Sequence, residues 1–322
     1  MQFDLIIIGG GPAGAATGVY AARKKIKTLL VTPEWGGQSV DSVGIQNWIG
    51  TKEISGIDFA KMLENHVRHY AGDSVTIKEE LVEKIEPLGN LVSKSEKLSF
   101  QVKTNKGKYT SKTVLITTGS HRRKLDIPGA KEFDGKGIAY CASCDAPLFY
   151  DQKVAVIGGG NAAFEAVSQL IAYAKSVTLL NRSENFKADP VTIELVSKNP
   201  KVKIITNAIP VEIKGDLPDG KAGKFVTVLV YEDQKEQKTV ELQVTGIFVE
   251  IGLLPTTGFA EPSGVEMNLI KQIVTDPRNQ RTSVKGIWAA GDCTDGLFHQ
   301  NNIAAGDAVK ALEDIYNELQ KM

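Results

Sequence analysis

Cysteine is scarce in this chain of 322 residues, which contains only Cys141, Cys144 and Cys293. So few cysteines exclude a small secreted scaffold held together by several disulfides. No second Cys-x-x-Cys pair accompanies Cys141 and Cys144, so the sequence offers no set of four thiolates for a structural zinc ion. We therefore expect no bound metal.

Long apolar runs and an excess of charge are also missing. No apolar run reaches the ~18–20 residues that a membrane-spanning helix needs. The 38 basic and 38 acidic residues cancel, and this balance indicates neither nucleic acid nor a membrane surface as a partner. Residues 3–8 run straight into a glycine loop and are typical of a buried strand rather than a signal peptide. We expect a cytoplasmic protein.

Glycine is more abundant, at 31 residues, and much of it lies in two similar loops. In each half of the chain a short apolar run is followed by a glycine loop, a helical stretch and a second apolar run. This pattern is typical of a Rossmann-like βαβ unit, in which backbone N–H groups at the helix N-terminus approach a pyrophosphate. The loop residues expected to bind nucleotides are Gly9, Gly11, Pro12, Ala13 and Gly14 in the first loop, and Gly158, Gly160, Asn161, Ala162 and Ala163 in the second.

The order of these segments predicts an α/β fold with two Rossmann-like dinucleotide-binding domains, the second inserted into the first. We place a discontinuous first domain at residues 1–117 and 247–322, and a second domain at 118–246. The two crossing strands near Thr117 and Gly246 would form a double hinge. The second helix is expected to end near Ala174, and apolar spacing over residues 304–319 predicts a closing helix.

Five further residues are candidates for the first nucleotide site. Glu34 lies where an acid can accept hydrogen bonds from ribose hydroxyls, although a solvated loop glutamate fits equally well. Asp292 follows a strand and a glycine, which suits it to anchor a flavin, or else to form a turn. Residues His299, Gln300 and Asn301 should open the last helix, where the helix dipole can stabilise negative charge on a reduced flavin.

The pair Cys141 and Cys144, followed at once by Asp145, indicates redox chemistry. A purely structural disulfide is the alternative, but a loop with two intervening residues stabilises a fold little. The lone Cys293 is expected to be a buried small residue.

Across nearly its whole length the chain resembles the low-molecular-weight thioredoxin reductases. The shared motifs are GGGPAG at 9–14, GGQ at 36–38, NWIG at 47–50, TTG at 117–119, CASCD at 141–145, GGGNAAFE at 158–165 and AAGD at 289–292. The resemblance implies FAD in the first domain, NADPH in the second, and a homodimer. It adds to the expected flavin contacts Gly37, Gln38, Asn47, Val82, Gly119 and Gly291, and it assigns the nicotinamide amide to Glu165. We expect the additional N-terminal domain of the peroxiredoxin-reducing relatives to be absent.

The resemblance also implies a role for each residue of the dithiol motif. Cys144 faces the flavin, and Cys141 attacks the substrate disulfide and forms a mixed disulfide that Cys144 resolves. Asp145 is the general acid that protonates the leaving thiolate; a helix N-cap is its alternative role. A rotation about the crossing strands would present the dithiol and the second glycine loop to the flavin in turn.

The sequence departs from the family at the second nucleotide site. The family's H-R-R-x-x-x-R, which grips the 2′-phosphate of NADPH, is here Asn181-Arg182-Ser183 ending at Lys187. Arg182 and Lys187 can still pair with a phosphate, although lysine lacks the bidentate fork of arginine. The run His121-Arg122-Arg123 does not substitute for this motif, because it follows the hinge strand. His299 stands where relatives commonly have arginine.

The leading hypothesis is a thioredoxin reductase that passes electrons from NADPH through FAD and the Cys141–Cys144 disulfide to a thioredoxin-like protein. Because this motif for the 2′-phosphate is only partly kept, NADH and ferredoxin are alternative electron donors. A dithiol oxidase that passes electrons to oxygen is a further alternative, and a flavin-bound interaction protein without enzymatic activity is the non-enzymatic one.

Overall fold

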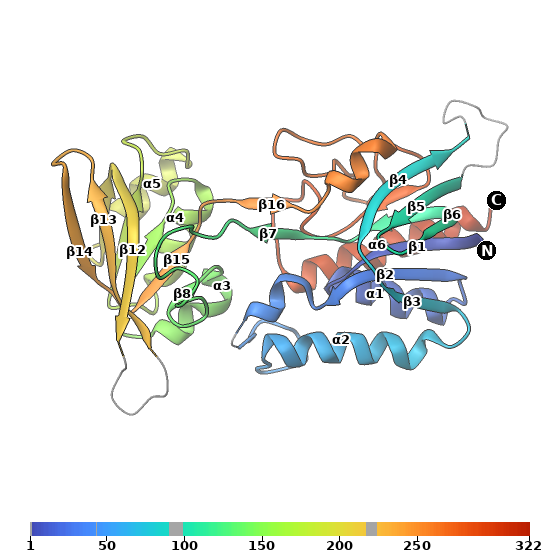
Figure 1. Ribbon diagram of the computed structural model, residues 1–322, viewed down its shortest axis with the longest axis horizontal. Helices are drawn as coiled ribbons and strands as arrows, with labels where there is room; N and C mark the ends of the chain where they lie inside the picture. Colours follow the sequence, from blue (N-terminus) through green and yellow to red (C-terminus); the bar gives the residue numbers. More distant parts are fainter. Residues whose placement is uncertain (1, 43, 90–98, 217–223) are drawn as a thin grey trace. The chain divides into compact units, whose positions relative to one another are not determined.

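The chain forms two compact units in a computed structural model that describes residues 2–42, 44–89, 99–216 and 224–322. Arg122–Leu253 forms the second unit, and most of the chain on either side of it forms the first (Figure 1). Each unit contains a sheet with parallel strands, one of which, β1 or β9, runs into a glycine loop and a helix. The predicted α/β fold, with the second unit inserted into the first, is confirmed.

A seven-stranded sheet forms the centre of the first unit. Its strand order is β3-β2-β1-β6-β5-β4, and β17 also pairs with β6. The strands are β1 (Gln2–Gly10), β2 (Thr28–Trp35), β3 (Val75–Glu79), β4 (Val82–Leu88), β5 (Ser99–Thr104), β6 (Lys108–Ile116) and β17 (Ile287–Ala289). Strands β1, β2, β3, β6 and β17 pair in parallel, so their carboxyl ends lie at one edge of the sheet.

At the central strands β1 and β6 both faces of this sheet are buried, as continuous apolar strands require. Ile6 and Ile8 of β1 belong to one apolar cluster, which also contains Val114 and Ile116 of β6. Their neighbours Leu5 and Ile7 are fully buried but lie outside that cluster, since side chains alternate between the two faces of a strand. The strand that leads into the first glycine loop is therefore fixed from both sides.

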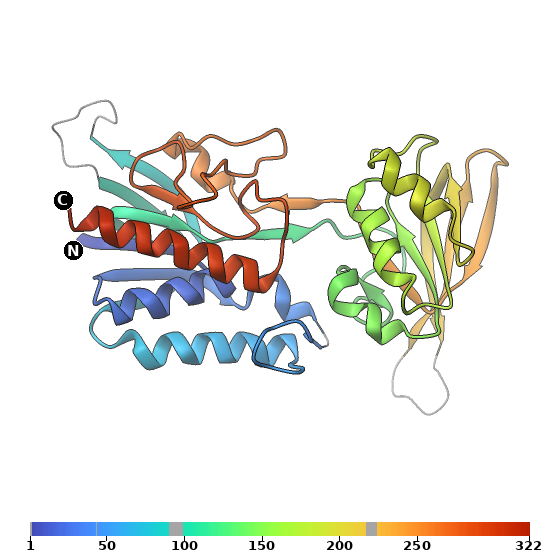
Figure 2. The same cartoon turned by 180° about the vertical axis from the view of Figure 1, so that it is seen from behind.

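Three helices complete the first unit: α1 (Pro12–Arg23), α2 (Gly56–Ala71) and α6 (Asn301–Leu319). Helix α1 contacts both α2 and α6, and Figure 2 shows α6 running beside it. Pro12 begins α1 at a position that needs no N–H donor. Ser55 caps α2 by accepting a hydrogen bond from the Asp58 N–H at 3.1 Å. The short 3₁₀ helices are η1 (Gly37–Asp41) and η3 (Gly258–Ser263).

The second unit contains two sheets. A five-stranded sheet has the order β11-β10-β9-β15-β8, and a three-stranded antiparallel sheet has the order β12-β13-β14. The strands are β8 (Ile138–Ala139), β9 (Lys153–Ile157), β10 (Ser176–Asn181), β11 (Val202–Thr206), β12 (Ala208–Asp216), β13 (Phe225–Asp233), β14 (Lys238–Gln243) and β15 (Gly246–Val249).

These two sheets and a helical layer form a three-layer unit. Val154 and Val156 of β9 cluster with Phe164 and Leu170 of the helix after the second glycine loop. On the opposite face, Ala155 and other residues of the five-stranded sheet cluster with residues of the three-stranded sheet. The helices are α3 (Ala142–Asp145), α4 (Asn161–Leu170) and α5 (Pro190–Ser197), with the 3₁₀ helix η2 (Ala146–Phe149). Helix α4 ends at Leu170, before the predicted Ala174, because the chain turns there to reach β10.

The chain enters and leaves the second unit through two short strands that pair with each other, β7 (Ser120–Arg122) and β16 (Leu253–Pro255). The strand that begins at Gly246 pairs with β9 and β8, so it belongs to the second unit. In the sequence, the boundaries between the two units lie at 121/122 and 253/254, whereas the prediction placed them at 117/118 and 246/247. Within the described ranges, no helix is both long enough and apolar enough to cross a membrane.

Candidate active site

The first glycine loop is shaped by close backbone contacts. Gly9 has φ = 117°, and a Cβ there would collide with the Thr117 carbonyl at the end of β6. A Cβ on Gly14 would collide with the carbonyl of Gly9 itself. A Cβ on Gly11 would meet no atom within 4 Å. Two of these glycines thus close the turn, and the third leaves open space beside the N-terminus of α1.

A cavity of about 400 Å³ lies over this loop, at the carboxyl ends of the parallel strands. It is lined by most of the residues that the sequence assigned to the flavin, namely Gly9, Gly11, Pro12, Ala13, Glu34, Gly37, Gln38, Val82, Gly119, Gly291, Asp292 and Asn301. Gly14, Asn47, His299 and Gln300 are not part of its lining. Such an edge is where ligands bind in open α/β sheets.

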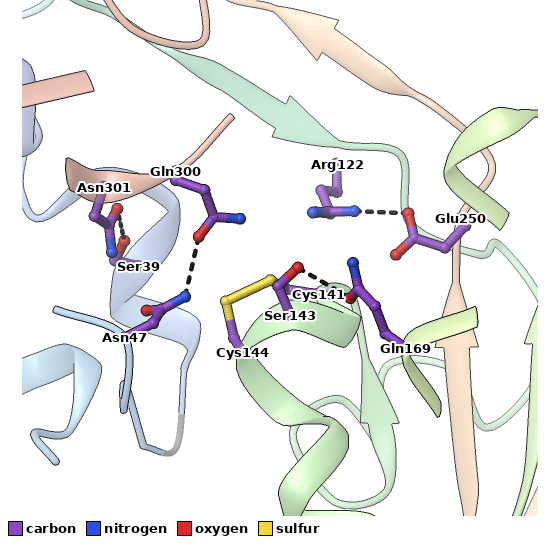
Figure 3. The surroundings of a disulfide bond; sticks show 10 residues. All are labelled: Ser39, Asn47, Arg122, Cys141, Ser143, Cys144, Gln169, Glu250, Gln300 and Asn301. Atoms are coloured by element: carbon purple, nitrogen blue, oxygen red, sulfur yellow. Dashed lines mark hydrogen bonds and ion pairs between the residues drawn. A yellow bond between two sulfur atoms is a disulfide. The ribbon is translucent and has the colours of Figure 1, made fainter. Parts of the chain in front are cut away.

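Three of these four residues lie in the structure that supports the cavity wall. The Asn47 side chain donates a hydrogen bond to the Gln300 side chain at 3.0 Å, next to the start of α6 (Figure 3). Gln300 is the N-cap residue of that helix. His299 Nδ1 lies 3.6 Å from a carboxylate oxygen of Asp292. These residues hold the segments that present Asp292 and Asn301 to the cavity.

Sequence reasoning missed several residues of the wall. Thr32 lines it from within β2 and Glu80 from just beyond β3, and Thr118, Ser120 and Thr256 line it from the crossing segments. The signal available in the sequence was their position directly at or after the end of an apolar run.

Glu80 is a buried carboxylate in this wall, with 7% of its surface exposed. Burial alone would raise its pKa, but hydrogen bonds from the Thr104 hydroxyl at 2.6 Å and the Tyr109 hydroxyl at 2.9 Å hold the pKa below its usual value. Glu80 therefore places a fixed negative charge beside the cavity.

The second glycine loop repeats the same backbone contacts. Gly158 has φ = 150°, and a Cβ there would collide with the Glu250 carbonyl beyond β15. A Cβ on Gly159 would collide with the Asn181 side chain, and a Cβ on Gly160 would meet nothing within 4 Å. The loop leads into α4, which begins at Asn161 and contains Ala162, Ala163 and Glu165. Here too the third glycine leaves open space at a helix N-terminus.

The rim of this second loop is exposed and carries two cations. Arg182 and Lys187 are exposed, and neither forms an ion pair with another described residue. Glu184 lies between them in the sequence, but its carboxylate is paired with Lys235 at 2.9 Å. The Asn181 side chain orders this turn by donating to the carbonyls of Ser183 and Asn185, at 2.8 Å and 3.1 Å. The arrangement leaves two positive side chains available to an anion.

Cys141 and Cys144 form a disulfide at the start of α3. Both cysteines are partly exposed, and the Cys144 N–H donates to the Cys141 carbonyl at 3.2 Å. The Ser143 hydroxyl contacts the Gln169 side chain at 2.9 Å, which ties α3 to α4 (Figure 3). The disulfide is thus accessible to another thiol while its backbone is fixed.

Asp145 follows the disulfide directly, and its carboxyl has an unusual environment. Burial raises the pKa of Asp145 to about 6, although the Arg122 guanidinium and a hydrogen bond from the backbone act against that rise. Asp145 is the N-cap residue of η2, but its side chain forms no capping hydrogen bond with that helix. A carboxyl with this pKa can both hold and release a proton near neutral pH.

Cys293 is fully buried, and its thiol lies 3.4 Å from the Ala290 carbonyl. Burial raises the pKa of Cys293 to about 12, so the thiolate that reacts with disulfides does not form there. The prediction of a buried small residue is confirmed.

The residues present fit a dinucleotide at both loops. In each unit two glycines bring the backbone close to neighbouring strands, and a third leaves room for a ligand beside helix N–H groups. In the first unit the cavity continues from the loop to Asp292 and the start of α6. This continuity suits an extended ligand such as FAD.

Comparisons with known proteins agree with this geometry. Residues 3–308 match the model of the family described as pyridine nucleotide-disulphide oxidoreductase. A crystal structure of thioredoxin reductase from Streptococcus pyogenes superposes with a TM-score of 0.87 at 30% identity, covering 100% of this chain and 99% of the other.

Curated relatives are longer than this chain. A component of the alkyl hydroperoxide reductase of Pseudomonas aeruginosa is 38% identical over 317 residues, which are 98% of this chain and 58% of the relative. A protein named NADH dehydrogenase from Bacillus subtilis is 39% identical over 311 residues, or 96% of this chain and 57% of the relative. The chain thus spans little more than half of these relatives.

The family match covers nearly the whole chain, and the resemblance read from the motifs is confirmed. Membership implies an oxidoreductase that uses FAD and a pyridine nucleotide. The chain belongs to the pyridine nucleotide-disulphide oxidoreductase family and has the fold of its thioredoxin reductases.

Proposed function

We propose that this protein is a flavin-dependent disulfide reductase that transfers electrons from a pyridine nucleotide to a small dithiol protein. The observation that carries the proposal is the accessible Cys141–Cys144 disulfide next to Asp145, whose pKa is about 6. FAD, when bound in the first unit, supplies the two-electron carrier between the nucleotide and the disulfide.

The chain's own residues then perform the thiol exchange. Once the disulfide is reduced, the Cys141 thiolate attacks one sulfur of the substrate disulfide, and the other sulfur leaves with the electron pair of the broken bond. Asp145 donates its proton to that leaving thiolate. Cys144 next attacks the Cys141 sulfur of the mixed disulfide, which restores the Cys141–Cys144 bond and releases the second substrate thiol.

We propose NADPH as the electron donor on the basis of the exposed turn beside the second glycine loop. Arg182 and Lys187 are exposed cations without a described ion-pair partner, and the nearby Glu184 is engaged by Lys235. A 2′-phosphate would pair with the two cations. The relative named NADH dehydrogenase favours NADH instead, so the donor test must compare both nucleotides.

A second class of partner follows from the relatives that are components of alkyl hydroperoxide reductases. In that case the dithiol would pass electrons toward a peroxiredoxin-type protein rather than a thioredoxin. The reactive disulfide and the thiol exchange would be the same in both cases, and only the protein surface that meets Cys141 would differ.

Anaerobic mixing of the flavin-loaded protein with NADPH or NADH tests the donor. We expect the flavin absorbance to bleach rapidly with NADPH, and more slowly with NADH. An unchanged spectrum with both nucleotides would sink the proposal and leave ferredoxin or a thiol as the donor. Rapid reoxidation by oxygen, without any disulfide substrate, would favour the dithiol oxidase.

Trapping with single cysteine variants tests the acceptor. Cys144→Ser should accumulate a mixed disulfide between Cys141 and a thioredoxin-like or peroxiredoxin-type protein, because the resolving thiol is gone. Cys293→Ser, at the buried cysteine, is the matched control and should trap nothing. If Cys141→Ser retains full turnover with the trapped protein, the disulfide is not part of the electron path.

A further inference from the structure

Glu250 lies between the two reactive elements of the second unit. It directly follows β15, the strand between β9 and β8 in the five-stranded sheet. Strand β9 leads into the second glycine loop, and β8 leads into the dithiol helix. Because the three strands are parallel, their carboxyl ends meet at one edge of the sheet. Glu250 also donates its N–H to the Ile157 carbonyl at 2.9 Å, just before Gly158.

The carboxylate of Glu250 is buried against Arg122. Its side chain is 6% exposed, and one carboxylate oxygen lies 2.8 Å from Arg122 Nη1 (Figure 3). Arg122 is 27% exposed and belongs to the sequence run His121-Arg122-Arg123, which the proposed function leaves without a role. Burying an ion pair costs desolvation free energy that the attraction between the two charges repays only in part. The effect of this pair on neighbouring groups therefore matters.

The same guanidinium also acts on Asp145. Arg122 is the cation that lowers the pKa of Asp145 against the effect of burial. Burial raises the pKa of Glu250 to about 7, while Arg122 lowers it and the carboxylate of Glu165 on α4 raises it further. One cation, Arg122, thus acts on both Asp145 and Glu250, and the carboxylate of Glu165 acts on Glu250 from α4. Because Asp145 and Glu250 share this cation, their protonation is coupled rather than independent.

We propose that Arg122 and Glu250 are positioning residues for the proton that Asp145 donates to the leaving thiolate. Arg122 favours the ionised form of Asp145 and so promotes release of the proton. Glu250, when ionised, offsets the charge of Arg122 and makes Asp145 hold its proton more strongly. The inference rests on the proposed function, because it assigns the proton to Asp145.

The arrangement has a consequence for the pH dependence of thiol exchange. Proton donation by Asp145 declines as the pH rises through its pKa of about 6. Ionisation of Glu250 near pH 7 adds a second negative charge, which slows the further loss of the Asp145 proton. In the unmodified protein, the fall of the thiol-exchange rate with rising pH (the alkaline limb of its pH profile) should therefore be broad and extend across both pKa values.

Single-turnover kinetics of the chemically reduced full chain test this directly. The reduced protein is mixed with 2-hydroxyethyl disulfide from pH 5 to pH 9, and the loss of protein thiols is followed after acid quench. Alkylation by iodoacetamide over the same range gives the thiolate fraction separately, because alkylation needs no proton donor. Dividing the exchange rate by the alkylation rate removes the effect of thiolate formation. The pH dependence that is left is the alkaline limb due to the general acid.

We expect Glu250→Gln to turn the broad limb into a single step near pH 6. The double variant Arg122→Gln/Glu250→Gln should move that step up by about one pH unit, because the remaining cation is lost. Comparing these two variants isolates the charge of Arg122 without leaving Glu250 unpaired. Arg123→Gln is the matched control at the adjacent exposed arginine and should leave the limb unchanged.

An identical limb in Glu250→Gln and in the double variant would overturn the inference. Asp145→Asn separates this failure from failure of the proposed function. If Asp145→Asn abolishes the limb while the other variants leave it unchanged, Asp145 donates the proton and only the role of Arg122 and Glu250 is refuted. If the limb survives in Asp145→Asn, Asp145 is not the donor, and the inference falls with that assignment.

Discussion

Each glycine loop follows a buried strand and precedes a helix, and the successive glycines make corresponding contacts in the two units. The first glycine, Gly9 or Gly158, abuts the carbonyl beyond a neighbouring parallel strand. The third, Gly11 or Gly160, faces open space. The backbone of both loops is therefore built for the same task, namely close approach to a phosphate.

The rims of the two loops differ much more. The first loop opens into a walled cavity with the buried carboxylate of Glu80 and with Asp292 in its lining. The second opens onto an exposed turn that presents Arg182 and Lys187. The comparison shows that the two loops share the backbone arrangement of their glycines and differ in the side chains around them, and we infer that those side chains distinguish the two dinucleotides.

The largest expected effect comes from the last loop position, which is Gly14 in the first loop and Ala163 in the second. Gly14→Ala should abolish flavin retention and cost about 1–3 kcal/mol of stability, because the added Cβ collides with the Gly9 carbonyl. Flavin absorbance per protein and the thermal midpoint measure both changes. Ala163→Gly, at the matching position of the second loop, should leave nucleotide affinity nearly unchanged. If Ala163→Gly lowers nucleotide affinity as much as Gly14→Ala lowers flavin retention, collision of the added Cβ is not the cause of the loss.

An intermediate effect is expected at the second rim. Arg182→Gln should raise KM for NADPH about tenfold, the equivalent of losing one charge-assisted hydrogen bond, and leave KM for NADH nearly unchanged. Steady-state kinetics with both nucleotides give the ratio of kcat/KM values. Lys235→Gln, which frees Glu184 instead, is the matched control and should not lower that ratio by as much. An unaltered ratio in Arg182→Gln would mean that the 2′-phosphate does not meet this side chain.

The smallest effect is expected at the residue that orders the rim. Asn181→Ala removes the hydrogen bonds to Ser183 and Asn185, and each such bond contributes about 0.5–1.5 kcal/mol. We expect KM for NADPH and for NADH to rise together, by roughly two- to tenfold. A selective loss of NADPH would instead make Asn181 a direct contact of the phosphate.

The sequence allowed the fold to be predicted because its strongest signals are local. A short apolar run followed by G-x-G-x-x-G and a helical stretch identifies β1 with α1, and the same pattern locates β9 with α4. Helix α6 was equally clear from its apolar spacing. The limits of the inserted unit were harder to place, because β15 joins β9 and β8 through pairing over a long sequence separation, which leaves no local signal.

The candidate site divides in the same way. Residues in motifs, such as Gly9, Asp292 and Cys141, were assigned from sequence. Glu80 was missed, because its importance comes from burial against Thr104 and Tyr109. Arg122 was set aside because it follows the hinge strand, and its partner Glu250 is 128 positions away in the chain. Pairwise charge interactions of this kind arise only after folding.

The paired strands β7 and β16 have a consequence for how this family can vary. The chain enters and leaves the second unit side by side, with the Arg123 N–H bonded to the Gly252 carbonyl at 3.0 Å. Outside that crossing, β6 and β17 pair directly within the first unit. The host sheet is thus continuous across the insertion. Recombination at the crossing would exchange the second glycine loop, the disulfide and Asp145 between relatives as one heritable block.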